Sequence, residues 1–165
     1  PPPPPPPPHP NQASMKIQSV AFTENQSIPK KYTCDRMPGT SELNPPISIS
    51  DVPADAKSLA LIMDDPDAPM GTFVHWVVWN IPADTTELQE GSLPTGAIEG
   101  INSSRKNDYV GPCPPSGTHH YRFHLYALDT VLDLSTSAGR GELVHAMEGH
   151  ILSEGELVGL YQRGA

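Results

Sequence analysis

The sequence predicts a mainly β protein, with an antiparallel sheet and a minor helical part, and three segments carry this prediction. Residues 58–64 (SLALIMD) are almost continuously apolar, as is typical of a strand buried on both faces. Residues 73–81 (FVHWVVWNI) are rich in β-branched and aromatic side chains, which favour strands. Residues 119–129 (HHYRFHLYALD) alternate between two kinds of side chain, as a strand with unlike faces does. Turn-forming residues separate these segments, so we expect an antiparallel arrangement.

Weaker patterns surround the three main strands. Residues 139–150 (GRGELVHAMEGH) predict one short helix with Leu143 and Met147 on the same face. Residues 82–118 form a long connection rich in Gly, Pro, Ser and Asn, and a connection of this length is more often functional than idle. Short strands are expected at residues 15–22 (MKIQSVAF), 27–35 (SIPKKYTCD) and 156–163 (ELVGLYQR).

The first fourteen residues, PPPPPPPPHPNQAS, differ from the rest of the chain. Proline lacks a backbone N–H and prefers the extended polyproline conformation, so this segment cannot join a packed core. We interpret residues 1–14 as a foreign or disordered proline-rich leader, and residues 15–165 as a single domain. A ligand for modules with aromatic grooves is the alternative for the leader.

Composition excludes several classes of protein. The chain has 10 Lys and Arg against 19 Asp and Glu, for a net charge of −9, and its basic residues never cluster beyond a pair. An acidic surface of this kind argues against nucleic-acid binding. No apolar run approaches the roughly twenty residues of a membrane span, and no signal peptide follows Met15.

The two cysteines, Cys34 and Cys113, lack the spacing of a metal site. The sequence alone does not decide whether the two cysteines form a disulfide. Because no export signal is visible, we favour buried thiols and a cytoplasmic location.

The ends of the three main strands carry polar side chains that could meet. Asp65 follows residues 58–64, and His75 alternates onto a largely apolar face with Phe73, Val77, Trp79 and Ile81. His119 and Tyr121 likewise begin the apolar face of their strand.

Each of these histidines, taken singly, fits a core imidazole with satisfied hydrogen bonds. If the strands are neighbours, however, two imidazoles and a phenol could supply donors to an anion, and a carboxylate could fix an imidazole tautomer. Pro114 and Pro115 would give such a pocket a stiff wall.

Three motifs at this separation, DDPDAP, FVHW and GPCPPSGTHHYRFHLYAL, carry a family resemblance. From Met15 to Arg163 the chain resembles the phosphatidylethanolamine-binding protein family, also called the Raf kinase inhibitor protein family, in its short bacterial and archaeal branch. The resemblance implies a large antiparallel sheet packed with a smaller sheet, plus short helices. It also implies a small pocket for phosphate or a phospholipid head group. By motif position the pocket residues are Asp65, Asp67, His75, Pro114, Pro115, His119 and Tyr121.

The chain departs from the family pattern at His120, where many members have arginine. Alternation places position 120 on the face opposite His119 and Tyr121, so we expect the pocket to survive and an outer salt bridge to be lost. Relatives in this branch are often dimers, so a homodimer is expected.

Two functions of different classes follow. The favoured one is a non-enzymatic protein that binds phosphate or a phospholipid head group without a cofactor and modulates a partner protein such as a kinase or a protease. The alternative is a metal-dependent or phosphate-ester hydrolase that uses Asp65, Asp67, His75 and His119. No GxSxG motif surrounds Ser116 and no HExxH motif is present, which disfavours the hydrolase.

Overall fold

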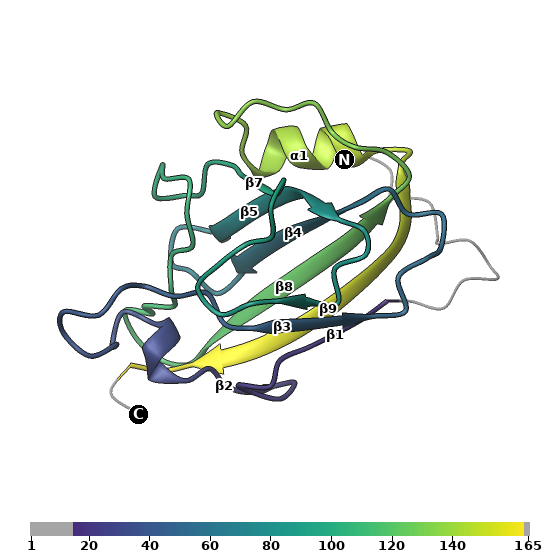
Figure 1. Ribbon diagram of the computed structural model, residues 1–165. Coiled ribbons are helices and arrows are strands. Elements are labelled where there is room, and N and C mark those ends of the chain that lie inside the picture. The colour runs from purple at the N-terminus through teal and green to yellow at the C-terminus, as the bar shows by residue number, and fades with distance from the viewer. Residues whose placement is uncertain (1–14, 164–165) are drawn as a thin grey trace.

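The computed structural model describes residues 15–163, so the predicted leader at residues 1–14 lies outside the described residues (Figure 1). A six-stranded sheet has the order β2-β9-β8-β4-β5-β7, and a three-stranded sheet has the order β1-β3-β6. The mainly β prediction is therefore confirmed. The elements are β1 (Lys16–Gln18), β2 (Gln26–Ser27), the 3-10 helix η1 (Lys30–Tyr32), β3 (Ile47–Ser50), β4 (Ser58–Asp65), β5 (Phe73–Pro82), β6 (Glu87–Leu88), β7 (Ile98–Glu99), β8 (His119–Leu128), α1 (Arg140–Met147) and β9 (Ile151–Tyr161).

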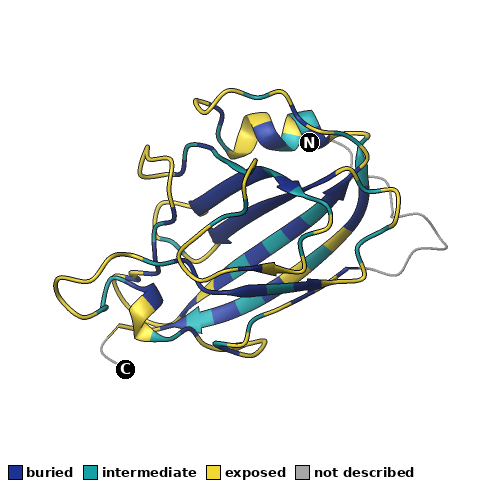
Figure 2. Ribbon diagram, viewed as in Figure 1, coloured by how far each residue is buried: buried dark blue, intermediate teal, exposed yellow. Residues whose placement is uncertain are grey.

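The three main strands of the sequence form the middle of the large sheet. β4 lies between β5 and β8 and pairs antiparallel with both. All eight residues of β4 are buried, which explains its continuous apolar character, whereas β8 alternates between buried and partly exposed residues (Figure 2). The sheet therefore presents the ends of these strands side by side.

Two hydrophobic cores lie on opposite faces of the large sheet. The inter-sheet core joins the large sheet to the small one and includes Ile49, Leu61, Trp76 and Phe123. The helix-side core joins the other face to α1 and includes Ile62, Val77, Trp79, Leu143 and Met147. The predicted helix and its buried face, Leu143 and Met147, are thus confirmed.

A β-bulge in β5 changes the face on which His75 lies. Met63 pairs with Trp76 and Asp64 pairs with Val74, so His75 is an extra residue between two partners. Such a bulge shifts the alternation of the strand. His75 consequently contacts the ring of Tyr121, on the inter-sheet side, whereas Val77 and Trp79 face the helix. The prediction that His75 shares a face with Val77 and Trp79 is wrong.

The strands at the chain ends are shorter or longer than predicted. The expected strand at residues 27–35 is wrong, since only Ser27 belongs to β2 and η1 follows. The closing strand begins earlier than predicted, at Ile151. β2 passes so close to β9 that a Cβ atom on Gly159 would lie 2.5 Å from Ile28 Cγ1, which explains the glycine at that position.

Cys34 and Cys113 form a disulfide across 79 residues of sequence. The preference for buried thiols is therefore wrong, and Cys113 is exposed. The two segments meet because the backbone N–H of Cys34 donates to the carbonyl of Pro112 at 3.0 Å. Among residues 15–163, no helix is long and apolar enough to cross a membrane.

Candidate functional site

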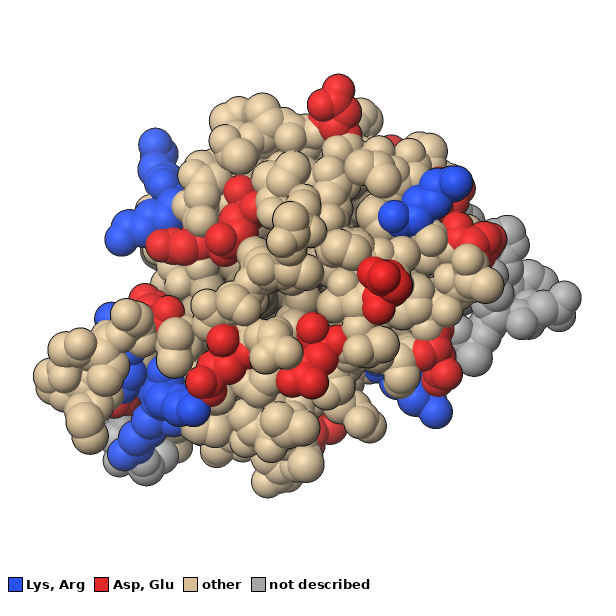
Figure 3. Space-filling model, in the orientation of Figure 1, with Lys and Arg blue, Asp and Glu red and all other residues tan. Residues whose placement is uncertain are grey.

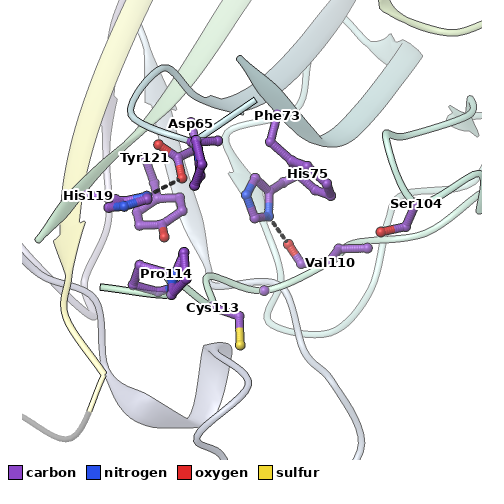
Figure 4. A pocket seen from close by; sticks show the side chains of 13 residues that line it. Asp65, Phe73, His75, Ser104, Val110, Cys113, Pro114, His119 and Tyr121 are labelled. Carbon is purple, nitrogen blue, oxygen red and sulfur yellow. Dashed lines mark hydrogen bonds and ion pairs between the residues drawn. The ribbon is translucent and has the colours of Figure 1, made fainter. Parts of the chain in front are cut away.

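A cavity of about 320 Å³ opens where three neighbouring strands of the large sheet end or begin. Asp65 ends β4, Phe73 and His75 lie at the start of β5, and His119 and Tyr121 lie at the start of β8. Antiparallel pairing brings the end of β4 beside the beginnings of β5 and β8. The loop that precedes β8 closes the other side (Figure 4). The lining residues are Asp65, Ala68, Pro69, Phe73, His75, Ser104, Val110, Gly111, Cys113, Pro114, Pro115, His119 and Tyr121.

Asp65 and His119 form a buried pair in this pocket. His119 Nδ1 lies 2.7 Å from Asp65 Oδ2, and the two side chains are 8% and 5% exposed. The other carboxylate oxygen of Asp65 accepts the backbone N–H of Asp67 at 2.8 Å. Because a carboxylate only accepts, His119 donates from Nδ1, and its Nε2 is the nitrogen left to meet a ligand.

His75 is held by the backbone of the facing loop. Its Nδ1 lies 2.6 Å from the carbonyl oxygen of Val110, and its Nε2 is buried without a partner. In Figure 4 this imidazole faces the space in front of Tyr121. Burial lowers the pKa of His75, and this effect exceeds the opposing ones of the Val110 carbonyl and of Asp65. His75 is therefore a neutral imidazole at neutral pH.

Tyr121 supplies the second unpaired polar atom of the pocket. Its hydroxyl is buried near the Asp65 carboxylate but makes no hydrogen bond of normal geometry, and the residue is 0% exposed. Burial, followed by the negative charge of Asp65, raises the pKa of Tyr121, so the phenol keeps its proton. The Tyr121 ring packs edge-on against His75, with centroids 5.3 Å apart, and stacks with His119 at 6.4 Å.

The structure brings six of the seven predicted residues into the lining, and Asp67 is the exception. Asp67 Oδ2 instead accepts from the backbone N–H of His120 at 2.8 Å and lies 2.7 Å from His120 Nδ1. These hydrogen bonds lower the pKa of Asp67. Asp67 lies outside the lining because its side chain bonds to His120, so its predicted role in ligand binding stays a prediction. The contact between His120 and Asp67 is an ion pair only when the imidazole is protonated, so the expected loss of an outer salt bridge stays a prediction.

Several lining residues were missed by the sequence analysis. Val110 contributes a carbonyl oxygen, which every residue has, so no side-chain pattern could reveal it. Ser104 and Cys113 reach the pocket from the long connection before β8. The length of that connection was a signal that it had a function, but it did not identify individual residues. Cys113 also ties the pocket wall to Cys34.

The proposed metal set is not assembled in the structure. Among residues 15–163, no group of three or more His, Cys, Asp or Glu side chains could hold a metal ion. Asp65 is paired with His119, Asp67 faces His120, and His75 bonds to Val110. The lining also contains no lysine or arginine, so the polar side chains of the pocket are two imidazoles, a carboxylate, a phenol and the hydroxyl of Ser104.

Comparison with known proteins identifies the class to which this fold and pocket belong. The profile of the family described as phosphatidylethanolamine-binding protein matches residues 18–162, so the chain belongs to that family. The chain is 51% identical to a UPF0098 protein of Methanothermobacter thermautotrophicus over 155 residues, which cover 91% of this chain and all of the relative. It is 50% identical to a UPF0098 protein of Pyrococcus horikoshii, over 91% of this chain and 77% of that protein. These relatives place the chain in the UPF0098 branch of bacteria and archaea.

Solved structures confirm the fold. A putative phosphatidylethanolamine-binding protein homologue from Chlamydia trachomatis, CT736, superposes with a TM-score of 0.85 at 40% identity, covering 91% of this chain and 98% of that chain. YbcL of E. coli, described as a new member of the mammalian family, superposes with a TM-score of 0.80 at 27% identity, covering 91% and 99%. The predicted arrangement of a large and a small sheet is thus confirmed.

Proposed function

We propose that this protein is a non-enzymatic binding protein whose pocket takes the phosphate group of a small molecule or a lipid head group. One observation carries the proposal: His75 Nε2 and the Tyr121 hydroxyl are buried and unpaired in the same cavity. Buried polar atoms are nearly always hydrogen-bonded, and leaving one unpaired costs on the order of 1–3 kcal/mol. A ligand that bonds to both atoms would remove that cost. Family membership supports an anion as that ligand.

The partner part of the proposal rests on the loops around the pocket. Both loops, residues 64–72 and 82–118, contribute residues to the lining of the pocket, and they would present a surface to a partner protein such as a kinase or a protease. Nucleic acid is a poor candidate, because Lys and Arg lie in small separate groups on the face in Figure 3, with carboxylates between them. A cytoplasmic location and a homodimer stay predictions.

The test is an NMR titration of the full chain with phosphate and then phosphoethanolamine. We expect shifts confined to the strand ends and the loop that line the pocket. His119→Ala removes a side chain that would form a charge-assisted hydrogen bond with the ligand, so affinity should fall by about 1.5–3 kcal/mol, or roughly ten- to over a hundredfold. His145→Ala is the matched control, because the His145 side chain is 85% exposed on α1, outside the pocket lining. Absence of shifts at millimolar phosphate would contradict the proposed function.

The second candidate is a phosphate-ester hydrolase, and the Asp65–His119 pair favours it over other enzymes. A carboxylate that bonds Nδ1 leaves Nε2 free to act as a general base, as in catalytic dyads. Release of phosphate from p-nitrophenyl phosphate, abolished by His119→Ala, would support this alternative. A rate equal to that of buffer, with and without added zinc, would favour the binding protein.

A further inference from the structure

The hydrogen bond between His75 and the loop fixes which atom of the imidazole can accept. A carbonyl oxygen only accepts, so the Nδ1 that lies 2.6 Å from Val110 O carries a proton. The backbone N–H of Val110 in turn donates to the carbonyl of His75 at 3.2 Å, so the two residues are held by two bonds. In the neutral ring the buried Nε2 therefore bears a lone pair and needs a donor.

The surroundings of His75 keep the ring neutral. The charged and titratable groups that face it or act on it through space are Asp65 and Asp64 from β4, Glu42 from the segment before β3, and His119 and Tyr121 from β8. The three carboxylates favour the charged imidazolium, but burial outweighs them and lowers the pKa of His75. His75 consequently enters the complex as an acceptor.

The rest of the pocket offers few donors to an anion. The backbone N–H groups of Val110 and Gly111 are used, by the carbonyl of His75 and by the carboxylate of Glu42. Pro114 and Pro115 have no N–H. Among the side chains of the lining, the hydroxyls of Tyr121 and Ser104 can donate, and so can His119 Nε2 when that ring is charged. The pocket thus combines a small number of donors with one obligate acceptor.

We propose that His75 selects a ligand that carries its own proton, namely the monoanion of a phosphate monoester. This inference rests on the function proposed above. In that complex the P–OH group donates to His75 Nε2, while the other oxygens accept from Tyr121 and His119. A phosphodiester, such as the bridging phosphate of a phospholipid, has the same charge but no P–OH. A fully ionised monoester would place a negative oxygen against the lone pair of His75.

Two small ligands separate these cases. At pH 5.5 dimethyl phosphate carries one negative charge and methyl phosphate is mostly the monoanion, since the second pKa of a phosphate monoester is about 6. Titration followed by NMR should give at least about tenfold tighter binding of methyl phosphate, because the diester leaves the buried acceptor unpaired. Between pH 5.5 and pH 7.5 the affinity for methyl phosphate should fall roughly twentyfold more than the affinity for dimethyl phosphate, as the monoanion is depleted.

The variant His75→Gln tests the residue itself. An amide can turn either its N–H or its carbonyl into the pocket, so the preference for the monoester should fall below about threefold. His145→Gln, the same substitution on the exposed face of α1, should keep the preference of the unchanged protein. If His75→Gln fails to fold, the inference is tested by comparing the affinities of the unchanged protein for methyl phosphate and dimethyl phosphate.

The outcomes separate this inference from the proposed function. Equal binding of both ligands, or tighter binding of the diester, would overturn the role of His75 and leave the anion pocket standing. If methyl phosphate, dimethyl phosphate and inorganic phosphate all fail to shift resonances at the pocket, both the role of His75 and the proposed anion pocket are overturned.

Discussion

At the scale of single residues, the pocket keeps two polar atoms buried and unpaired at a cost to stability. His75 Nε2 and the Tyr121 hydroxyl lie at the starts of β5 and β8, on either side of β4, where an apolar pair would pack without this cost. Functional sites often retain groups that destabilise the empty fold, because binding needs them. A substitution that removes one of these atoms should therefore change stability and binding in opposite directions.

Tyr121→Phe makes this contrast measurable. Removing the unpaired hydroxyl leaves the ring in the inter-sheet core, so the free energy of unfolding should stay unchanged or rise by up to about 1 kcal/mol. Affinity for phosphate should fall by about 1–2 kcal/mol, since a donor to the anion is lost. Urea denaturation and the NMR titration measure the two effects.

Tyr109→Phe is the matched comparison for stability. The Tyr109 hydroxyl is also buried, but it donates to the carbonyl of Tyr32 at 2.7 Å. Its removal should lower the free energy of unfolding by about 1 kcal/mol or more. If Tyr121→Phe destabilises the fold as much as Tyr109→Phe, then the Tyr121 hydroxyl has a hydrogen-bond partner in the ligand-free protein. The proposal that this hydroxyl is left unpaired for a ligand would then be wrong.

At the scale of the strands, an ion pair between the buried Asp64 of β4 and the partly exposed Arg122 of β8 links two strands of the large sheet. Asp64 Oδ1 accepts from Arg122 Nε at 2.8 Å and Oδ2 accepts from Arg122 Nη2 at 3.2 Å. His124 Nε2 lies 3.4 Å from the same carboxylate. Burial alone would raise the pKa of Asp64, but the hydrogen bonds from His124 and Arg122 together lower it. This pair joins two strands whose ends form the pocket.

Asp64→Asn should lower the free energy of unfolding by about 2 kcal/mol at pH 7. The value lies below the range for a fully buried pair because the Arg122 side chain is 34% exposed. The folded pKa of Asp64 lies below its unfolded value, so the unfolded chain binds the proton first. The stabilisation is complete above about pH 5 and is lost as the pH falls through the folded pKa. Denaturation at pH 7, 5 and 3.5 should show a weaker acid dependence in the variant than in the unchanged protein.

Asp51→Asn is the control for this experiment, because Asp51 forms an exposed contact with Lys16. Such contacts contribute little, so its free energy of unfolding should change by less than about 0.5 kcal/mol. An acid dependence in Asp64→Asn as steep as that of the unchanged protein would contradict the role of Asp64.

The strands also show which features a sequence can predict. β4, β5 and β8 were predicted because burial on two faces, or on one, leaves a pattern in the side chains themselves. The pairing of β3 with β6 depends on two short segments far apart in the chain, and such segments have no periodicity of their own. The bulge at His75 inserts one residue into a regular pattern, and only the partner strand reveals it.

The residues of the candidate site were likewise predictable where side chains alternate along a strand, and not where they lie in a turn. His119 and Tyr121 were placed together by simple alternation, and alternation holds throughout β8. Motif position carried Asp67 into the predicted site, but the turn after β4 directs its side chain to His120. Sequence patterns cannot fix the direction of a side chain in a turn, because each turn residue takes its own backbone conformation.

At the scale of the whole molecule, one covalent bond links the pocket to a distant segment. Cys113 lines the pocket, and its disulfide to Cys34 attaches the loop before β8 to the residues after η1. Disulfides persist in oxidising surroundings, so the bond does not support the cytoplasmic location that was predicted from the absence of a visible export signal. Location therefore stays a prediction that fractionation of the native cells would test.

Reduction of this disulfide should weaken both the fold and the pocket. The bond closes a loop between positions 79 residues apart, and a loop of this length stabilises a protein by about 4 kcal/mol through the unfolded state. Cys113 is exposed, so a reductant can reach it. We expect the urea midpoint to fall in dithiothreitol. Phosphate affinity should fall as well, because the loop that carries Pro114 and Pro115 is then no longer covalently attached to Cys34. The double variant Cys34→Ser, Cys113→Ser should match the reduced protein in both measurements and should not respond to dithiothreitol. An identical midpoint with and without reductant, together with mass spectrometry showing free thiols in both samples, would mean that the two cysteines are not bonded in solution.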